Sequence, residues 1–349
     1  MLLLGNHSVQ FMETNSPPTE HEPPGIESVI VPVVFGLIFV VGVIGNCLVM
    51  VVIGKVRYGS RGRDTGGRKS RSPTNLFILN LCAADLLFLF FCVPLHATIY
   101  SLPEWVFGAF LCKFAHFFST VSMLVSIFTL ASMSVDRYIA VVRSGTSIRS
   151  RKNALFGLCV IWTLSLLCSV PVAQHQVLTN HPSAPNSTFC WEEWSGASKH
   201  TYKVSVLLLG FLLPLLLISC CYIRVLFHLH KKMKNMSKKS KHSKTKTAQT
   251  VLLLVAAFTI CWMPHHIIAM WVEFGRFPLN DASFVFRIVS HCLSYGNSCV
   301  NPILYAFLSE NFRRARHQVL TCRFLFPPPP NNKVTRCRME NGSITHSTI

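Results

Sequence analysis

The chain has 349 residues, of which 50% are hydrophobic and 13% are charged, whereas soluble domains carry about 25% charged residues. Its formal net charge is +19, but most of the basic residues are concentrated in alternate segments between apolar runs and in the C-terminal tail. This distribution argues against a nucleic-acid-binding protein. The composition excludes an ordinary soluble domain and indicates an all-α membrane protein.

Seven apolar runs each reach or approach the roughly 20 residues that a helix needs to cross a bilayer. Lipid offers the backbone no hydrogen-bond partner, so each run is predicted to be helical. Residues 309–322 are predicted to form a short amphipathic helix on the cytoplasmic membrane surface, and 323–349 a flexible cytoplasmic tail. The sequence thus predicts a seven-transmembrane helix bundle over 29–308, with spans Val29–Ile53, Leu76–Ile99, Leu111–Val142, Leu155–Ala173, Val204–Phe227, Thr247–Trp271 and Phe284–Leu308.

The charges also predict the orientation of the bundle. Of the 33 Lys and Arg residues, only five fall on the side of the N-terminal tail, 1–28: Lys113, Lys199, Lys203, Arg276 and Arg287. Because basic residues are retained on the cytoplasmic side, the N-terminus is predicted to be extracellular and the C-terminus cytoplasmic, in the plasma membrane. The basic loops then face anionic membrane lipids and cytosolic partners.

Several candidate modification sites follow from this orientation. Cys112 and Cys190 are the only cysteine pair on the oxidising side, and a disulfide between them is expected. Asn6 and Asn186 begin extracellular sequons and are candidate glycosylation sites. Cys322 follows the amphipathic stretch and is either a palmitoylation site or a plain thiol.

Polar side chains lie at membrane depth in several spans, where each needs a partner or a water-filled cavity. Asp85 is the one acid among them. Two interpretations stay open, a sodium site built from oxygen ligands or a hydrated polar network without an ion. The residues concerned are Asn46, Asp85, Ser126, Asn297, Ser298 and Asn301. No zinc-type Cys/His spacing occurs.

Each span carries a motif that resembles the rhodopsin-class G-protein-coupled receptors, in the same order. The motifs are Gly45-Asn46, Leu81–Asp85, Asp136-Arg137-Tyr138, Trp162, Pro214, Cys261–Pro264 and Asn301–Tyr305. The resemblance implies that Arg137 releases Asp136 on activation and engages a G protein. It also implies that Tyr222 and Tyr305 support the active state, that Trp262 acts as a pivot beside the Pro264 kink, and that arrestin binds the tail.

Longer stretches resemble the galanin receptors, with the type 1 members as the nearest pattern: Pro73–Asn80, Val121–Leu130, Phe189–Glu192, Met263–Ile268 and Ala306–Phe312. This resemblance implies a receptor for the neuropeptide galanin that signals through inhibitory Gi/Go proteins and lowers cyclic AMP. It implies peptide contacts at His266, Glu273 and Phe284.

The chain departs from the type 1 pattern at two positions. Ser119 replaces a phenylalanine and Ala269 replaces a second pocket histidine. A related peptide such as spexin or kisspeptin therefore stays an alternative ligand. A membrane transporter is a more distant alternative, because no inverted repeat is found. No paired catalytic groups lie at depth, so neither enzyme activity nor an organic cofactor is expected.

Overall fold

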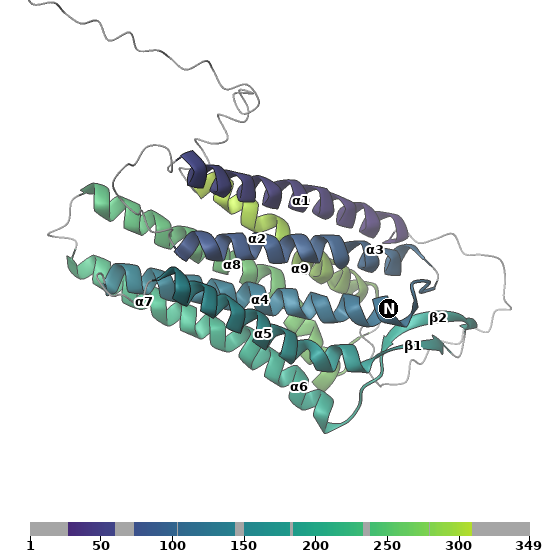
Figure 1. Ribbon diagram of the computed structural model, residues 1–349. Helices are drawn as coiled ribbons and strands as arrows, with labels where there is room; N and C mark the ends of the chain where they lie inside the picture. Colours follow the sequence, from purple (N-terminus) through teal and green to yellow (C-terminus); the bar gives the residue numbers. More distant parts are fainter. Residues whose placement is uncertain are drawn as a thin grey trace, which may run out of the picture.

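The computed structural model describes residues 27–59, 73–102, 104–143, 150–181, 184–232, 238–278 and 280–308. Long helices run side by side, and a two-stranded hairpin covers one end of the bundle (Figure 1). The helices are α1 (Glu27–Gly59), α2 (Pro73–Phe91), α3 (Val93–Ser101), α4 (Gly108–Val142), α5 (Arg151–His175), α6 (Ala197–Leu207), α7 (Leu213–Lys232), α8 (Lys238–Phe274) and α9 (Asp281–Leu308). We name the two ends of the bundle the hairpin end and, opposite to it, the Arg137 end.

The predicted seven-helix membrane bundle is confirmed. Within the described residues, six segments are long and apolar enough to cross a membrane: Ser28–Gly54, Pro73–Ser101, Gly108–Val142, Arg151–His175, Ala197–His228 and Val251–Phe274. The seventh, α9, is less apolar because it carries Asn297, Asn301 and several serines, and it packs against both α1 and α8. Asn6, Cys322, the amphipathic helix 309–322 and the tail 323–349 lie outside the described residues.

Prolines interrupt two of the spans. The second span breaks into α2 and α3 at Cys92, two residues before Pro94. The fifth span changes from α6 to α7 through a π-helical turn, Leu208–Leu212, just before Pro214. Proline lacks the backbone N–H that would continue the helical ladder, so the backbone adjusts in the turn around it. Pro171, Pro264 and Pro302 lie inside continuous helices.

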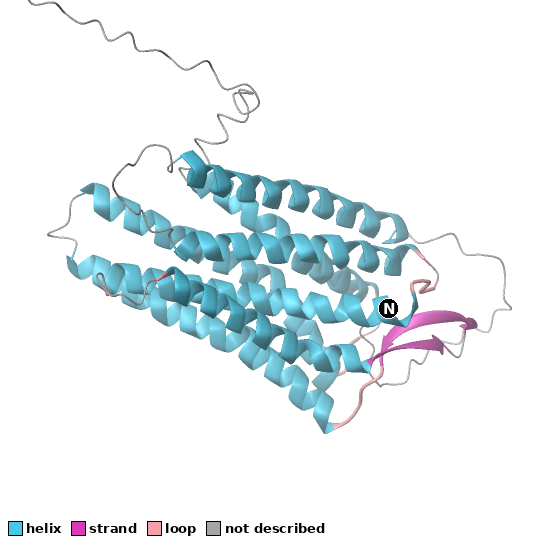
Figure 2. Cartoon of the chain, viewed as in Figure 1, coloured by secondary structure: helices cyan, strands magenta, loops and turns pink. Residues whose placement is uncertain are grey.

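The hairpin was not predicted from the sequence. Strands β1 (Gln176–His181) and β2 (Ala184–Glu192) pair antiparallel between α5 and α6, and they are the strands in Figure 2. The disulfide between Cys112 and Cys190 is present as predicted, and it ties β2 to the first turns of α4. Trp105 packs against this disulfide, and its backbone N–H donates to Thr188 O at 2.7 Å. The hairpin is therefore held over the bundle from two sides.

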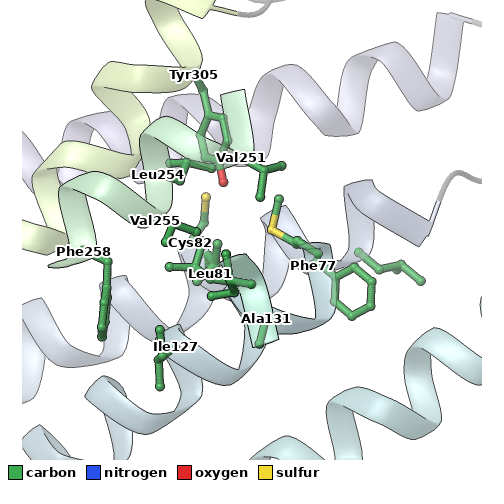
Figure 3. Packing of buried hydrophobic residues seen from close by; sticks show 14 of the residues in the cluster. Phe77, Leu81, Cys82, Ile127, Ala131, Val251, Leu254, Val255, Phe258 and Tyr305 are labelled. Carbon is green, nitrogen blue, oxygen red and sulfur yellow. The ribbon is translucent and has the colours of Figure 1, made fainter. Parts of the chain in front are cut away.

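The largest group of buried side chains includes residues of α1, α2, α4, α7, α8 and α9, and Figure 3 labels members from α2, α4, α8 and α9. Leu81, Ile127, Leu254, Phe258 and Tyr305 are all fully buried there. Because these side chains come from four helices, a displacement of α8 must repack the whole group, since protein interiors are close-packed.

Close approach of α1 and α9 depends on a glycine. A Cβ placed at Gly45 would lie 2.8 Å from Pro302 Cβ, closer than side chains pack, whereas a Cβ at Gly36 meets no atom within 4 Å. Gly45→Ala is therefore expected to lower the free energy of unfolding by about 1–3 kcal/mol through overpacking. Gly36→Ala is the control and should be neutral or stabilising by up to about 1 kcal/mol. Thermal unfolding in detergent measures both, and equal midpoints would contradict the close contact.

Candidate ligand site

A cavity of about 180 Å³ opens at the hairpin end, between the helices and beneath β1 and β2. Its walls come from α3, α4, α5, α6, α8 and α9 together with both strands. Helices alone would leave this end open, so the disulfide-tethered hairpin forms part of the wall through Gln176, Trp191 and Glu192. The result is a concave site with apolar walls and a few polar groups, which is the usual form of a ligand site.

Helix α8 contributes one continuous face to the cavity. Trp262, His266, Ala269 and Glu273 all line it, and their spacings of four, three and four residues place them along one side of a helix. Trp262 and Glu273 are eleven residues apart, or about 16 Å along the axis. The predicted ligand residues His266 and Glu273 therefore meet in one cavity. Phe284 lies outside the lining and instead contacts Arg287, whose guanidinium carbon is 5.7 Å from the ring centre.

Histidines from four helices gather in the cavity wall, and the sequence analysis identified only His266 among them. They are His96, His116, His265, His266 and His291. Nε2 of His116, Nε2 of His266 and Nε1 of Trp262 are buried without a hydrogen-bond partner in the part of the chain that the structure describes. Buried polar atoms are normally paired. These three atoms therefore offer unused donors and acceptors to a molecule in the cavity. The one sequence signal was that His116 precedes Ser119 by three residues, which places both on one helix face.

The acids of the cavity are already paired with bases. Glu273 accepts Lys199 Nζ at 3.3 Å and contacts His200 Nδ1 at 3.1 Å, while Glu192 contacts Lys203 Nζ at 3.0 Å. The two lysines are one turn apart on α6. Lys203 therefore links α6 to the hairpin through Glu192, and Lys199 links α6 to α8 through Glu273. Glu273 was predicted to contact the peptide, and the structure shows that its carboxylate is already paired with a lysine of the chain itself.

A second polar group lies deeper in the bundle, around Asp85. Ser298 Oγ donates to Asp85 Oδ1 and Asn301 Nδ2 to Oδ2, each at 2.9 Å, and Asn46 Nδ2 donates to Ser298 O at 2.9 Å. Ser126 and Asn297 are buried, but neither hydrogen-bonds to Asp85 among the described side chains. Asn46 Oδ1 is buried without a partner within the described ranges. One carboxylate among neutral oxygens fits a small hard cation such as sodium.

The Arg137 end is closed by an acid–base pair. Arg137 Nη2 lies 3.1 Å from Asp136 Oδ2, and the same oxygen accepts a hydrogen bond from Thr74 Oγ1 at 2.8 Å. Tyr138 packs against the main buried cluster, which includes Tyr222 and Tyr305, as well as Trp262 nearer the cavity. Tyr138, Tyr222, Trp262 and Tyr305, four of the predicted signalling residues, thus share one continuous core that reaches the cavity lining at Trp262.

Comparison with known proteins places these features in a family. A family model described as "7 transmembrane receptor (rhodopsin family)" matches residues 45–305. Human galanin receptor type 1 (Homo sapiens) is 56% identical over 328 residues, covering 92% of the chain and 91% of that receptor. Galanin receptor type 1 of Rattus norvegicus is 54% identical over 338 residues, covering 95% and 94%.

A more distant relative is galanin receptor 2a of Danio rerio, 40% identical over 305 residues, which cover 86% of the chain and 80% of that receptor. These relatives are receptors rather than enzymes, as the sequence predicted for this chain. With the motifs in seven consecutive spans, the tethered hairpin and a match along nearly the whole length, the chain belongs to the rhodopsin family of seven-transmembrane receptors and, within it, to the galanin receptors.

Proposed function

We propose that the chain is a receptor for galanin that acts through inhibitory Gi/Go proteins to lower cyclic AMP. The observation that carries the ligand is the meeting of His266 and Glu273 in one cavity at the hairpin end. The names of the relatives support the same peptide. The unpaired ring nitrogens of His116 and His266 fit the hydrogen-bonding groups of an indole or phenol on a peptide.

The proposed orientation places the hairpin end outside the cell and the Arg137 end in the cytoplasm. It is supported by the excess of Lys and Arg in the segments at the Arg137 end, which is the charge bias of cytoplasmic loops. The disulfide between Cys112 and Cys190 lies at the hairpin end and suits an oxidising exterior. The cavity then faces extracellular peptides, and Arg137 faces cytosolic G proteins and arrestin.

Helix α8 links the two ends in the proposed mechanism. Its outer part lines the cavity through His266 and Glu273, and its inner part packs Leu254 and Phe258 into the main buried cluster. A peptide that binds better to one position of α8 shifts the population toward that position. Displacement of the inner part opens the core beside Asp136 and Arg137. The released guanidinium is then free to engage the G protein.

Sodium binding at Asp85 is proposed as a regulator of this equilibrium. An ion that binds only the folded protein stabilises it by an amount that grows with the logarithm of the ion concentration, about 2.7 kcal/mol at a hundred times the Kd. Sodium chloride is expected to raise the unfolding midpoint above that in equal potassium chloride. Asp85→Asn should abolish this difference, because the charged ligand is lost. Thermal unfolding in matched salts measures it, and an equal sodium effect in the variant would exclude Asp85 as a ligand.

Titration of galanin on cells expressing the chain tests the proposed function. A saturable fall in cyclic AMP that pertussis toxin blocks is the expected result. His266→Ala should weaken the response by about 10–100-fold, because a buried hydrogen-bonding partner is removed. His175→Ala is the control, since His175 is only partly buried and lies outside the cavity lining. If the receptor reaches the cell surface but responds to spexin or kisspeptin and not to galanin, the responding peptide replaces galanin as the proposed ligand.

A further inference from the structure

Among the described residues, a cation close to the cavity has no acid within ion-pair distance. Lys199 and Lys203 are each paired with a glutamate. Arg287, on the first turns of α9, has no carboxylate within ion-pair distance in the described ranges of the chain, and its buried Nε has no hydrogen-bond partner there. Removing a charge from water without a partner is unfavourable. Arg287 is therefore a half-buried donor group that the folded chain leaves unsatisfied.

Two phenylalanines fix the position of this guanidinium. Its central carbon lies 5.9 Å from the ring centre of Phe277 and 5.7 Å from that of Phe284. Both rings fall within the range of cation–π contacts. Phe277 is held in turn by an edge-to-face contact with Trp271 at 5.2 Å. An arginine clamped in this way keeps its planar set of N–H donors in one orientation.

The clamped arginine does not line the cavity but lies one helical turn beyond the lining residue His291, a position that we call the rim. It precedes His291 by four residues on α9, and His291 lines the cavity and shares a 2.6 Å hydrogen bond with the Tyr100 hydroxyl. Residues four apart share one helix face and are separated by about 6 Å along the axis. Arg287, His291 and Tyr295 thus follow one another at four-residue intervals along one face of α9. The last two line the cavity, and Arg287 lies one turn beyond them.

We propose that Arg287 is a ligand-binding residue whose guanidinium donates hydrogen bonds to oxygen acceptors of the bound peptide, and that Phe284 acts by positioning Arg287. The acceptor is either a carboxylate or a main-chain carbonyl, since both match the forked geometry of an arginine. This inference rests on the proposed function. It also explains how Phe284 contributes to peptide binding while lying outside the cavity lining.

The test measures the Kd of labelled galanin and, separately, the unfolding midpoint of the unliganded receptor. Arg287→Gln is expected to weaken galanin binding at least tenfold, because the charge and most donors are lost. The unliganded midpoint should change little, because the two cation–π contacts that are lost are offset by removal of a half-buried charge that has no acidic partner. Arg287→Lys keeps the charge but lacks the forked donor geometry of arginine. Its Kd for galanin should fall between those of the wild type and Arg287→Gln. Arg276→Gln is the matched control, since Arg276 is exposed on the neighbouring segment, and should leave the Kd unchanged.

A double-mutant cycle separates positioning from direct contact by Phe284. Phe284→Leu alone should weaken binding, but in the Arg287→Gln background it should cause no further loss, because residues that act through one another are not additive. Fully additive effects would remove Phe284 from the proposal. The dependence of wild-type affinity on potassium chloride identifies the acceptor: a steep loss with salt indicates a carboxylate, and a shallow one indicates a carbonyl.

Each outcome decides the assignment. Galanin affinity within twofold of wild type in Arg287→Gln overturns it while leaving the proposed function intact. Weakened binding with an equally lowered unliganded midpoint in both Arg287→Gln and Arg287→Lys makes the residue structural and also overturns it. If the wild-type receptor does not bind galanin, the proposed ligand fails, and the assignment fails with it.

Discussion

Lys199→Met is expected to lower the free energy of unfolding of the unliganded receptor by about 3–5 kcal/mol. Lys199 and Glu273 contact each other at 3.3 Å, and their side chains are only 8% and 6% exposed. Removing one partner of such a pair leaves the other charge buried and uncompensated, which costs far more than the pair contributes when intact. His200 still contacts Glu273, but its ring is 45% exposed. Thermal and denaturant unfolding in detergent measure the effect.

The double variant Lys199→Met, Glu273→Met should recover most of the lost stability. Replacing a buried pair with apolar side chains of similar volume is often neutral or stabilising. The matched control is Lys203→Met. Its pair with Glu192 has similar length, but the partners are 21% and 22% exposed, so the change should cost about 0–1 kcal/mol. Equal losses in Lys199→Met and Lys203→Met would contradict the argument from burial.

The same pair bears on how the ligand enters. A peptide amine that approaches Glu273 must displace Lys199, so the measured affinity includes the cost of breaking an existing contact. Because the pair joins α6 to α8, displacing it also releases the outer end of α8. Ligand binding and α8 motion are therefore coupled at this position in the proposed mechanism.

The spans could be predicted because hydrocarbon forces long apolar stretches to be helical. The residues at which these helices begin and end could not be predicted in the same way. Helix α6 begins at Ala197, seven residues before the predicted Val204, because Lys199 and Lys203 lower the apparent hydrophobicity but are paired with glutamates in the fold. Helix α8 begins at Lys238 rather than Thr247, in a lysine-rich run. Hydropathy indicates which residues lie within the membrane, but it does not indicate how far a helix extends beyond the membrane into water.

The candidate site was predicted only in part. The disulfide could be predicted from the membrane topology, since Cys112 and Cys190 were the two cysteines assigned to the extracellular side. His266 and Glu273 followed from a family pattern and share the cavity. His96, His116 and His291 come from three different helices, and no spacing in the sequence joins them. The ion pairs and the hairpin depend in the same way on tertiary packing, which a single sequence does not encode locally.

Ser119 and Ala269, the two departures from the type 1 pattern, both line the cavity. Each substitution removes a ring, so this cavity is wider than one built with phenylalanine and histidine at the same positions. Ala269→His is expected to tighten galanin binding by about 1–3 kcal/mol, because the new imidazole lies between His266 and Glu273 on the same face of α8. Ser119→Phe should contribute a similar amount through apolar burial. Competition binding with labelled galanin measures both.

Substitutions at the same positions supply the controls. Ala269→Leu adds volume without a hydrogen-bonding group and should not reproduce the gain of Ala269→His. Ser119→Ala removes the hydroxyl without adding a ring and should leave affinity near wild type. If galanin binding improves in the double variant while the response to spexin falls, the two small residues set ligand choice by leaving space that another peptide fills. If neither peptide distinguishes the variants, the cavity tolerates both sizes, and selectivity must come from the Lys199–Glu273 pair in the cavity wall or from Arg287 at the rim.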